Sequence, residues 1–142
     1  MNKLQITTII CTLVTLAACT SAPIQPNNGG DLSPCGNFPN CVTSLDDSSW
    51  AYIKPLAANS QQWQALKQTL SQRDGWQITT SKDLFVQAVV TTPTMRFKDD
   101  VQLQFVSAKN IIHIRSSSRL GYSDMGANAA RVERLRKILR TL

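Results

Sequence analysis

The chain has 142 residues, of which 42% are hydrophobic and 17% are charged, and its formal net charge is +6. This length suits one domain with one hydrophobic core. The positive charge favours anionic lipid, anionic glycan or acidic partners, although it also serves simply to keep a small protein in solution. One histidine and the absence of a C-x₂-C spacing argue against a structural zinc site.

The N-terminus has the features of an export signal. Lys3 precedes an apolar run from Ile6 to Ala18 that is diluted by threonines. At about 13 residues this run is shorter than the roughly 20 that a membrane-spanning helix needs, and small residues at its end are typical of a cleaved signal. Leu16-Ala17-Ala18-Cys19 resembles the lipobox of bacterial lipoproteins. We expect a lipoprotein signal peptide over residues 1–18; an ordinary cleaved signal and a retained anchor are the alternatives.

Lipidation at Cys19 determines the expected location. Acyl chains on Cys19 would hold the protein on a membrane of the cell envelope, facing the periplasm, because two or more chains anchor stably. Thr20 rather than aspartate follows the cysteine, and by resemblance to lipoprotein sorting this favours the outer membrane. The membrane is therefore the expected partner, and nucleic acid is not expected in this compartment.

Residues 19–34 are predicted to be a flexible tether, because they are rich in Pro, Asn, Gly and Ser. The domain is predicted over residues 35–142. Cys35 and Cys41 are the cysteines that remain after cleavage and lipidation, and they flank a loop rich in Gly, Asn and Pro. In an oxidising compartment this pair predicts a disulfide.

A helix is predicted from Asn59 or Ser60, as its cap, to about Arg73. Trp63, Leu66 and Leu70 repeat on one face, and Asp74-Gly75 provides the stop. The period then changes to two, which predicts a strand from Trp76 to Thr80. After a turn at residues 81–83, the almost continuous apolar and β-branched run from Leu84 to Val90 predicts a second strand.

The next two segments predict a hairpin. Apolar and polar residues alternate over residues 101–105 and again over residues 112–115, and a four-residue loop is predicted at 107–110. Pairing Val106 with Ile111 sets Gln104 opposite His113, and it places the apolar residues on one face and polar residues on the other.

The final segment, residues 127–142, is predicted to be helical. Val132, Leu135, Leu139 and Leu142 form its apolar stripe. The order of helix, several antiparallel strands and helix predicts an α+β fold, in which a β-meander is covered by two helices as a two-layer sandwich.

The segment Pro39-Asn40-Cys41-Val42-Thr43-Ser44 carries a resemblance, together with the motifs Arg96-Phe97-Lys98-Asp99-Asp100-Val101, residues 114–128 and Arg131-Val132-Glu133. The sequence resembles the family called domain of unknown function 1499 from about Cys35 to the C-terminus. Such a resemblance implies an envelope protein, often a lipoprotein, without an assigned reaction.

A set of charged, hydroxyl and amide side chains in this region is the candidate site for an anionic ligand such as anionic lipid or envelope glycan. The set comprises Arg96, Asp99, Asp100, Arg115, Ser116, Ser118, Arg119, Asp124, Asn128 and Arg131. Guanidinium groups and hydroxyls suit carboxylates, phosphates and sulfates, and a helix N-terminus adds anion affinity. The structural alternative is that the aspartates pair with Arg115 or Arg119 and that Asp124 or Asn128 caps the last helix.

The expected function is a non-enzymatic envelope factor, with no catalytic residue, cofactor or metal assigned. The alternative is a small hydrolase. It would use His113, one of Ser116, Ser117, Ser118 or Ser123, and one of Asp99, Asp100 or Asp124 as a triad. The sequence lacks the G-x-S-x-G elbow that would support such a triad.

Overall fold

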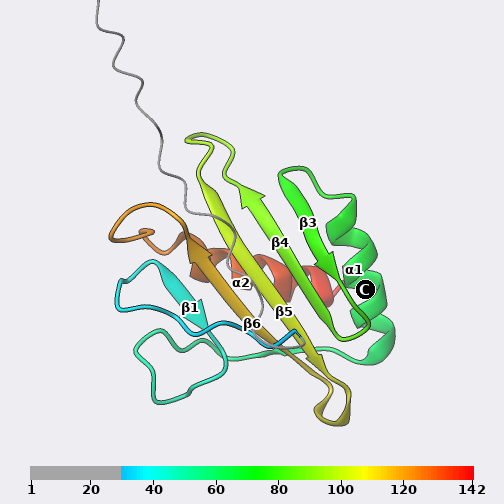
Figure 1. Cartoon of the computed structure of the whole chain (residues 1–142). Helices are drawn as coiled ribbons and strands as arrows, with labels where there is room; N and C mark the ends of the chain where they lie inside the picture. Colours follow the sequence, from blue (N-terminus) through cyan, green and yellow to red (C-terminus); the bar gives the residue numbers. More distant parts are fainter. Residues whose placement is uncertain (1–29) are drawn as a thin grey trace, which may run out of the picture.

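Strands β3 (Trp76–Ser81), β4 (Phe85–Thr91), β5 (Lys98–Val106) and β6 (Ile111–Ser118) form an antiparallel meander in this computed structural model, which describes residues 30–142 (Figure 1). Two short strands, β1 (Cys41–Thr43) and β2 (Leu56–Ala57), pair with β6 at the edge of the sheet. The helices are α1 (Ser60–Ser71) and α2 (Ala127–Leu139). The predicted α+β meander with two helices is confirmed, and its sheet is open.

The predicted register of the β5–β6 hairpin is confirmed. Val106 pairs with Ile111, and Gln104 pairs with His113. The four-residue loop is a 3-10 turn over Ser107–Lys109 followed by Asn110, which has a φ of 50°. Asparagine tolerates this left-handed conformation better than most residues, so the loop closes without a glycine.

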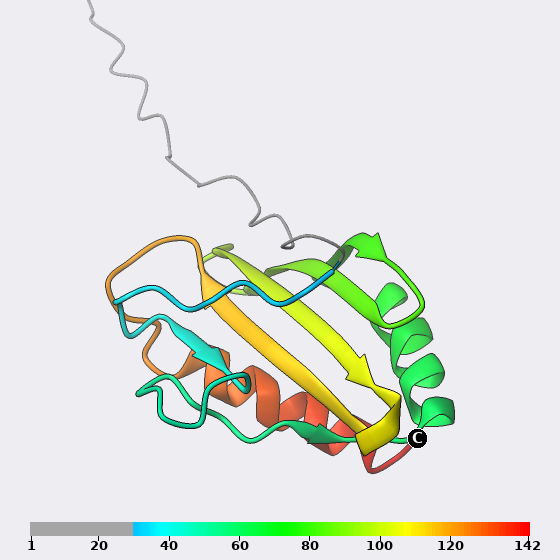
Figure 2. The ribbon, with the colours of Figure 1, turned by 60° about the horizontal axis from the view of Figure 1, so that its bottom comes forward.

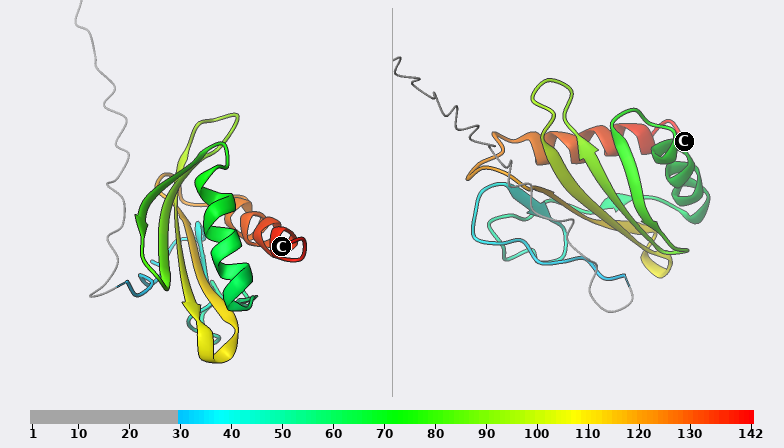
Figure 3. Two further views of the ribbon diagram at one scale, coloured as in Figure 1. Left: turned by 90° about the vertical axis from the view of Figure 1, so that its right-hand side faces the viewer. Right: turned by 45° about the horizontal axis from the view of Figure 1, so that its top comes forward.

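Both helices lie on one face of the sheet, where they enclose the core (Figure 3). Asn59 caps α1, with its side chain accepting from the Gln62 backbone N–H, while the Gln62 side chain accepts from the Asn59 N–H. The core contains Leu56, Trp63, Leu66, Leu70, Val101, Leu103, Phe105, Ile112, Ile114, Val132, Leu135 and Leu139. Burial of these apolar side chains is the main force that holds the two layers together.

Residues 30–35, here called the strap, cover the opposite face of the sheet, where they cross β5 and β6 (Figure 2). Leu32 is 3% exposed. The Ser33 N–H donates to Gln102 Oε1 at 2.9 Å, and Gln104 Nε2 donates to Asp31 at 2.9 Å. The structure differs here from the predicted tether of residues 19–34, because residues 30–34 pack on the domain.

The strap ends in the predicted disulfide, Cys35–Cys41, which is confirmed. The bond ties the strap to β1 at the edge of the sheet. Residues 1–29, including the predicted signal peptide and Cys19, lie outside the described residues. None of the helices within residues 30–142 is both long enough and apolar enough to cross a membrane.

Candidate functional site

The sheet divides the candidate site residues between its two faces. Neighbouring residues on a strand point to opposite sides. Asp99 therefore faces the helices, where it pairs with Arg131, and Asp100 shares the strap face with Gln102, which bonds to Ser33. Ser116 bonds to residues of α2, whereas Arg115 bonds to the strap. The ten residues predicted as one polar cluster are therefore not brought together, and Arg96 stands apart in the exposed β4–β5 turn.

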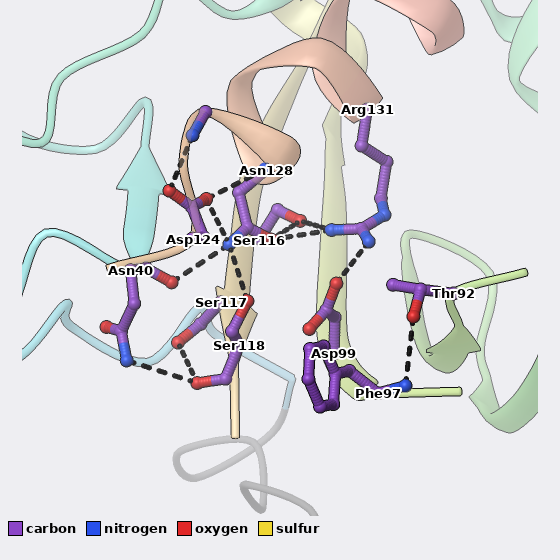
Figure 4. A network of polar contacts seen from close by, with 11 residues as sticks. Asn40, Thr92, Phe97, Asp99, Ser116, Ser117, Ser118, Asp124, Asn128 and Arg131 are labelled. Atoms are coloured by element: carbon purple, nitrogen blue, oxygen red, sulfur yellow. Dashed lines mark hydrogen bonds and ion pairs between the residues drawn. The ribbon is translucent and has the colours of Figure 1, made fainter. Parts of the chain in front are cut away.

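One group, here called the α2 cluster, comprises Asp99, Ser116, Ser118, Asp124, Asn128 and Arg131 (Figure 4). Asn128 lies at its centre and is fully buried. Its Nδ2 donates to the backbone oxygen of Asn40 at 2.9 Å, to Ser118 Oγ at 3.1 Å and to Asp124 Oδ2 at 2.6 Å. Its Oδ1 accepts from Ser116 Oγ at 2.7 Å. The side chain thus links α2 to β6 and to the segment before β1.

Asp124 organises the start of α2 from outside the helix. Its Oδ1 accepts from the Gly126 N–H at 3.0 Å, and its Oδ2 accepts from the Asn128 N–H at 2.8 Å. These N–H groups have no partner within the helix, so a carboxylate here satisfies them and complements the helix dipole. The position that the sequence marked as an anion site is already filled by the chain's own carboxylate.

The guanidinium of Arg131 is held inside the α2 cluster. Nη1 donates to Ser116 Oγ at 2.8 Å and to Asn128 Oδ1 at 2.5 Å, while Nη2 pairs with Asp99 Oδ2. Both partners of the ion pair are almost wholly buried. Asp99 Oδ1 is also buried, but it has no hydrogen-bond partner. The fixed arrangement of Arg131 makes it a structural link between α2 and β5.

A second buried arginine group lies on the strap face. Arg119 forms a two-pronged pair with Asp100, at 3.0 Å from Nε and 2.8 Å from Nη2. Arg115 donates from Nε to the backbone oxygen of Pro34 at 3.3 Å, and its Nη1 has no partner. Burial lowers the pKa of Arg115, and the nearby charge of Asp100 opposes that shift. This group attaches the strap to the sheet.

His113 bonds to a serine that the sequence did not single out. Its Nδ1 lies 3.1 Å from both the hydroxyl and the carbonyl oxygen of Ser44. The Ser44 hydroxyl also accepts from the Ile114 N–H at 2.8 Å. His113 has no hydrogen bond to the serines or aspartates of the hydrolase alternative among the described residues, and Ser116 lies on the other face of the sheet.

A cleft of about 380 Å³ opens between α2, the end of α1 and the β3–β4 edge of the sheet. It is here called the helix cleft. Trp76, Val90, Leu135 and Ile138 contribute apolar surface to it, and Arg73, Arg131 and Arg134 contribute guanidinium groups. The exposed side chains of Arg73 and Arg134 form no hydrogen bond or ion pair within residues 30–142.

Sequence reasoning did not identify Arg73 and Arg134 as a pair. Arg73 follows α1 and Arg134 lies in the middle of α2. No local spacing connects them, because it is the packing of the two helices on the sheet that brings both to one cleft. The only signal in the sequence was the general excess of arginine and lysine.

Comparison with known proteins identifies the family of the domain. Residues 31–139 match the family described as "Protein of unknown function (DUF1499)". No curated protein and no solved structure matches the chain. The matched residues include residues 31–35 of the strap, the sheet, both helices and the α2 cluster. The chain therefore belongs to the DUF1499 family, as its sequence motifs indicated.

Proposed function

We propose that the protein is a lipid-anchored, non-enzymatic binding protein of the cell envelope, and that it holds an anionic ligand in the helix cleft. The lipobox-like string that ends at Cys19 supports the anchor. It predicts lipid on the N-terminal side of a single domain, facing the periplasm. The tether would then consist of residues 19–29, since the strap begins at Gly30 in the structure.

The proposed activity rests on two arginines of the helix cleft whose side chains form no hydrogen bond or ion pair with the described residues. Arg73 and Arg134 line the same cleft, and within the described part of the chain Asp74 is the only acidic residue in its lining. Arg131 also lines the cleft, but Asp99 neutralises it. A guanidinium offers a planar set of donors that suits carboxylate and phosphate. The cleft therefore favours an anion.

The apolar wall of the helix cleft narrows the ligand class. Trp76 and Ile138 are half-buried, and Val90 and Leu135 lie deeper beside them. An inorganic anion would leave this apolar surface wet, whereas an alkyl chain would cover it and gain roughly 25 cal/mol per Å² of apolar area buried. Of the two ligand classes expected from the sequence, anionic lipid suits this cleft better than a glycan.

The internal pairing of the polar residues supports a role without catalysis. A general base must reach the proton that it abstracts. His113 instead bonds to the hydroxyl of Ser44, which also accepts from the Ile114 N–H of β6. Arg119 and Arg131 are held by Asp100 and Asp99. These side chains stabilise the fold, whereas Arg73 and Arg134 offer exposed donors that form no hydrogen bond or ion pair within residues 30–142.

The test is a titration of the purified full chain, in nonionic detergent, with hexyl phosphate followed by calorimetry. Saturable binding is expected, and inorganic phosphate and hexanol should each bind at least about tenfold more weakly, which corresponds to about 1.4 kcal/mol. Arg73→Glu and Arg134→Glu should each weaken the binding of hexyl phosphate by a similar factor. Both residues are exposed, so the variants should fold.

Lys137→Glu is the matched control, since Lys137 is an exposed residue of α2 that does not line the helix cleft. It changes the net charge of the protein by the same amount as Arg134→Glu. If Lys137→Glu weakens binding as much as Arg134→Glu does, the attraction is a general effect of net charge. Absence of saturable binding to the wild-type chain would overturn the proposed activity.

A further inference from the structure

A second hollow of about 290 Å³ lies beside the Asp99–Arg131 pair, under the β4–β5 turn and the β6–α2 loop. It is here called the Asp99 hollow. Phe97, Leu120, Met125 and Ala127 form most of its apolar wall, and Asp99 and Asp124 contribute carboxylates. Its lining contains no arginine or lysine, in contrast to the helix cleft. The two sites therefore differ in the charge of their walls.

Asp99 has one oxygen that no group among residues 30–142 satisfies. Oδ2 pairs with Arg131, but Oδ1 is buried without a hydrogen-bond partner, and Asp99 as a whole is 1% exposed. In Figure 4 this second oxygen points away from Arg131. A buried acceptor without a donor destabilises the folded state, and such groups are rare in folded proteins. The oxygen needs a donor, and Asp99 lines the hollow from which one can come.

The charge of the surroundings indicates which donor fits. Arg131 offsets the charge of Asp99, and Asp124 adds one further negative charge, while Asp124 bonds only to N–H groups of the α2 region. The formal sum around the hollow is thus negative. Phe97 adds an aromatic ring, and a ring face attracts a cation. The negative formal charge and the aromatic ring both disfavour an anion in the Asp99 hollow.

We propose that the Asp99 hollow binds a primary ammonium group on a compact, partly apolar body, with Asp99 Oδ1 accepting one of its N–H bonds. The ammonium supplies a charged donor to the orphaned oxygen, and the apolar body contacts Leu120, Met125 and Phe97. This inference goes beyond the anion site and does not depend on it. The amine can be a free molecule or the headgroup of an ethanolamine lipid, because the recognised group is the same.

The test is an NMR titration of the isotope-labelled full chain with n-butylamine, beside n-butanol and butyrate as matched probes. Butylamine should shift the amide signals of Asp99, Leu120 and Gly121 in a saturable way. Butanol and butyrate should bind at least about tenfold more weakly. A further arm compares short-chain phosphatidylethanolamine with phosphatidylcholine, whose quaternary group has no N–H to donate. A lipid source predicts that the ethanolamine lipid binds more tightly than butylamine, and a free-amine source predicts the reverse.

Two variants keep the proposal falsifiable. Leu120→Trp fills the hollow from an exposed rim position and replaces no residue of the α2 cluster, so the fold should survive. Asp99→Asn removes the negative charge of the proposed acceptor, so it tests whether amine binding needs that charge. Each should weaken butylamine binding by at least about tenfold. The proposal is overturned if butylamine shifts no signals around the hollow, if butanol binds equally well, or if Leu120→Trp binds butylamine as the wild type does.

Discussion

Arg131 and Arg115 are both 3% exposed, but they differ in what they contact. Arg131 pairs with Asp99 and bonds to Ser116 and Asn128, whereas Arg115 has one hydrogen bond, to the Pro34 carbonyl, and an unpartnered Nη1. Removing one partner of a buried ion pair strands the other charge. Removing a poorly satisfied buried cation relieves a desolvation cost.

These contacts predict that replacement by methionine destabilises the protein much more at Arg131 than at Arg115. Arg131→Met should lower the free energy of unfolding by about 3–5 kcal/mol, because it leaves the Asp99 carboxylate buried and unpaired. Arg115→Met should change it by only about 1 kcal/mol, since Arg119 still holds Asp100. Urea unfolding of the two variants measures both values. Equal costs, or a larger cost at Arg115, would contradict the assignment of Arg131 as the structural arginine.

The sequence predicted which residues belong to the candidate sites better than it predicted which of them contact one another. Alternation along β5 and β6 explains why Asp99 and Asp100 have different partners, and the hairpin register was predictable because hydrophobic period and loop length agree. The pairing of Asp99 with Arg131 depends on where α2 packs, and that position is set by tertiary contacts of Val132 and Leu135. The same holds for the meeting of Arg73 and Arg134.

The strap shows how an element can be missed from sequence. Its residues are polar or small, so its composition resembles a linker, and only Leu32 is buried as an apolar anchor. Long-range hydrogen bonds, such as those between Ser33 and Gln102, hold it on the sheet. By contrast, α1 and α2 were predictable from their apolar stripes. β3, β5 and β6 were predictable from their period of two, and β4 from its continuous apolar run, while β1 and β2 are too short for a pattern.

The Cys35–Cys41 disulfide should hold the strap in place. The oxidised protein should be lighter than the reduced form by two hydrogens, which an intact-mass measurement tests. Reduction should lower the free energy of unfolding by about 2 kcal/mol, the loop-entropy value for so short a loop. Hydrogen exchange should increase in residues 30–35 and stay unchanged in α2.

The Cys35→Ser/Cys41→Ser protein is the control for this prediction, and it should behave like the reduced wild type. Free thiols in the oxidised preparation would show that the bond does not form in solution. Unchanged exchange of the strap after reduction would show that hydrogen bonds to Gln102 and Gln104 suffice to hold it.

The molecule as a whole combines a proposed lipid anchor with a two-layer domain. In cells given an alkyne analogue of palmitate, the wild-type protein should take up label and the Cys19→Ala variant should take up none. Cys11→Ala provides the matched control, because Cys11 lies within the apolar run and would be discarded with the signal. In-gel detection of the incorporated label measures this. An unlabelled wild-type protein, or a labelled Cys19→Ala variant, would refute the lipid anchor at Cys19.

Mapping by NMR where hexyl phosphate lies on the protein tests the proposed anion site. We expect intermolecular contacts from the alkyl chain to the Trp76 ring and to Ile138, and the phosphate should shift the side-chain signals of Arg73 and Arg134. Contacts that map to the strap face around Arg115 and Arg119, or that are absent from the helix cleft, would contradict it.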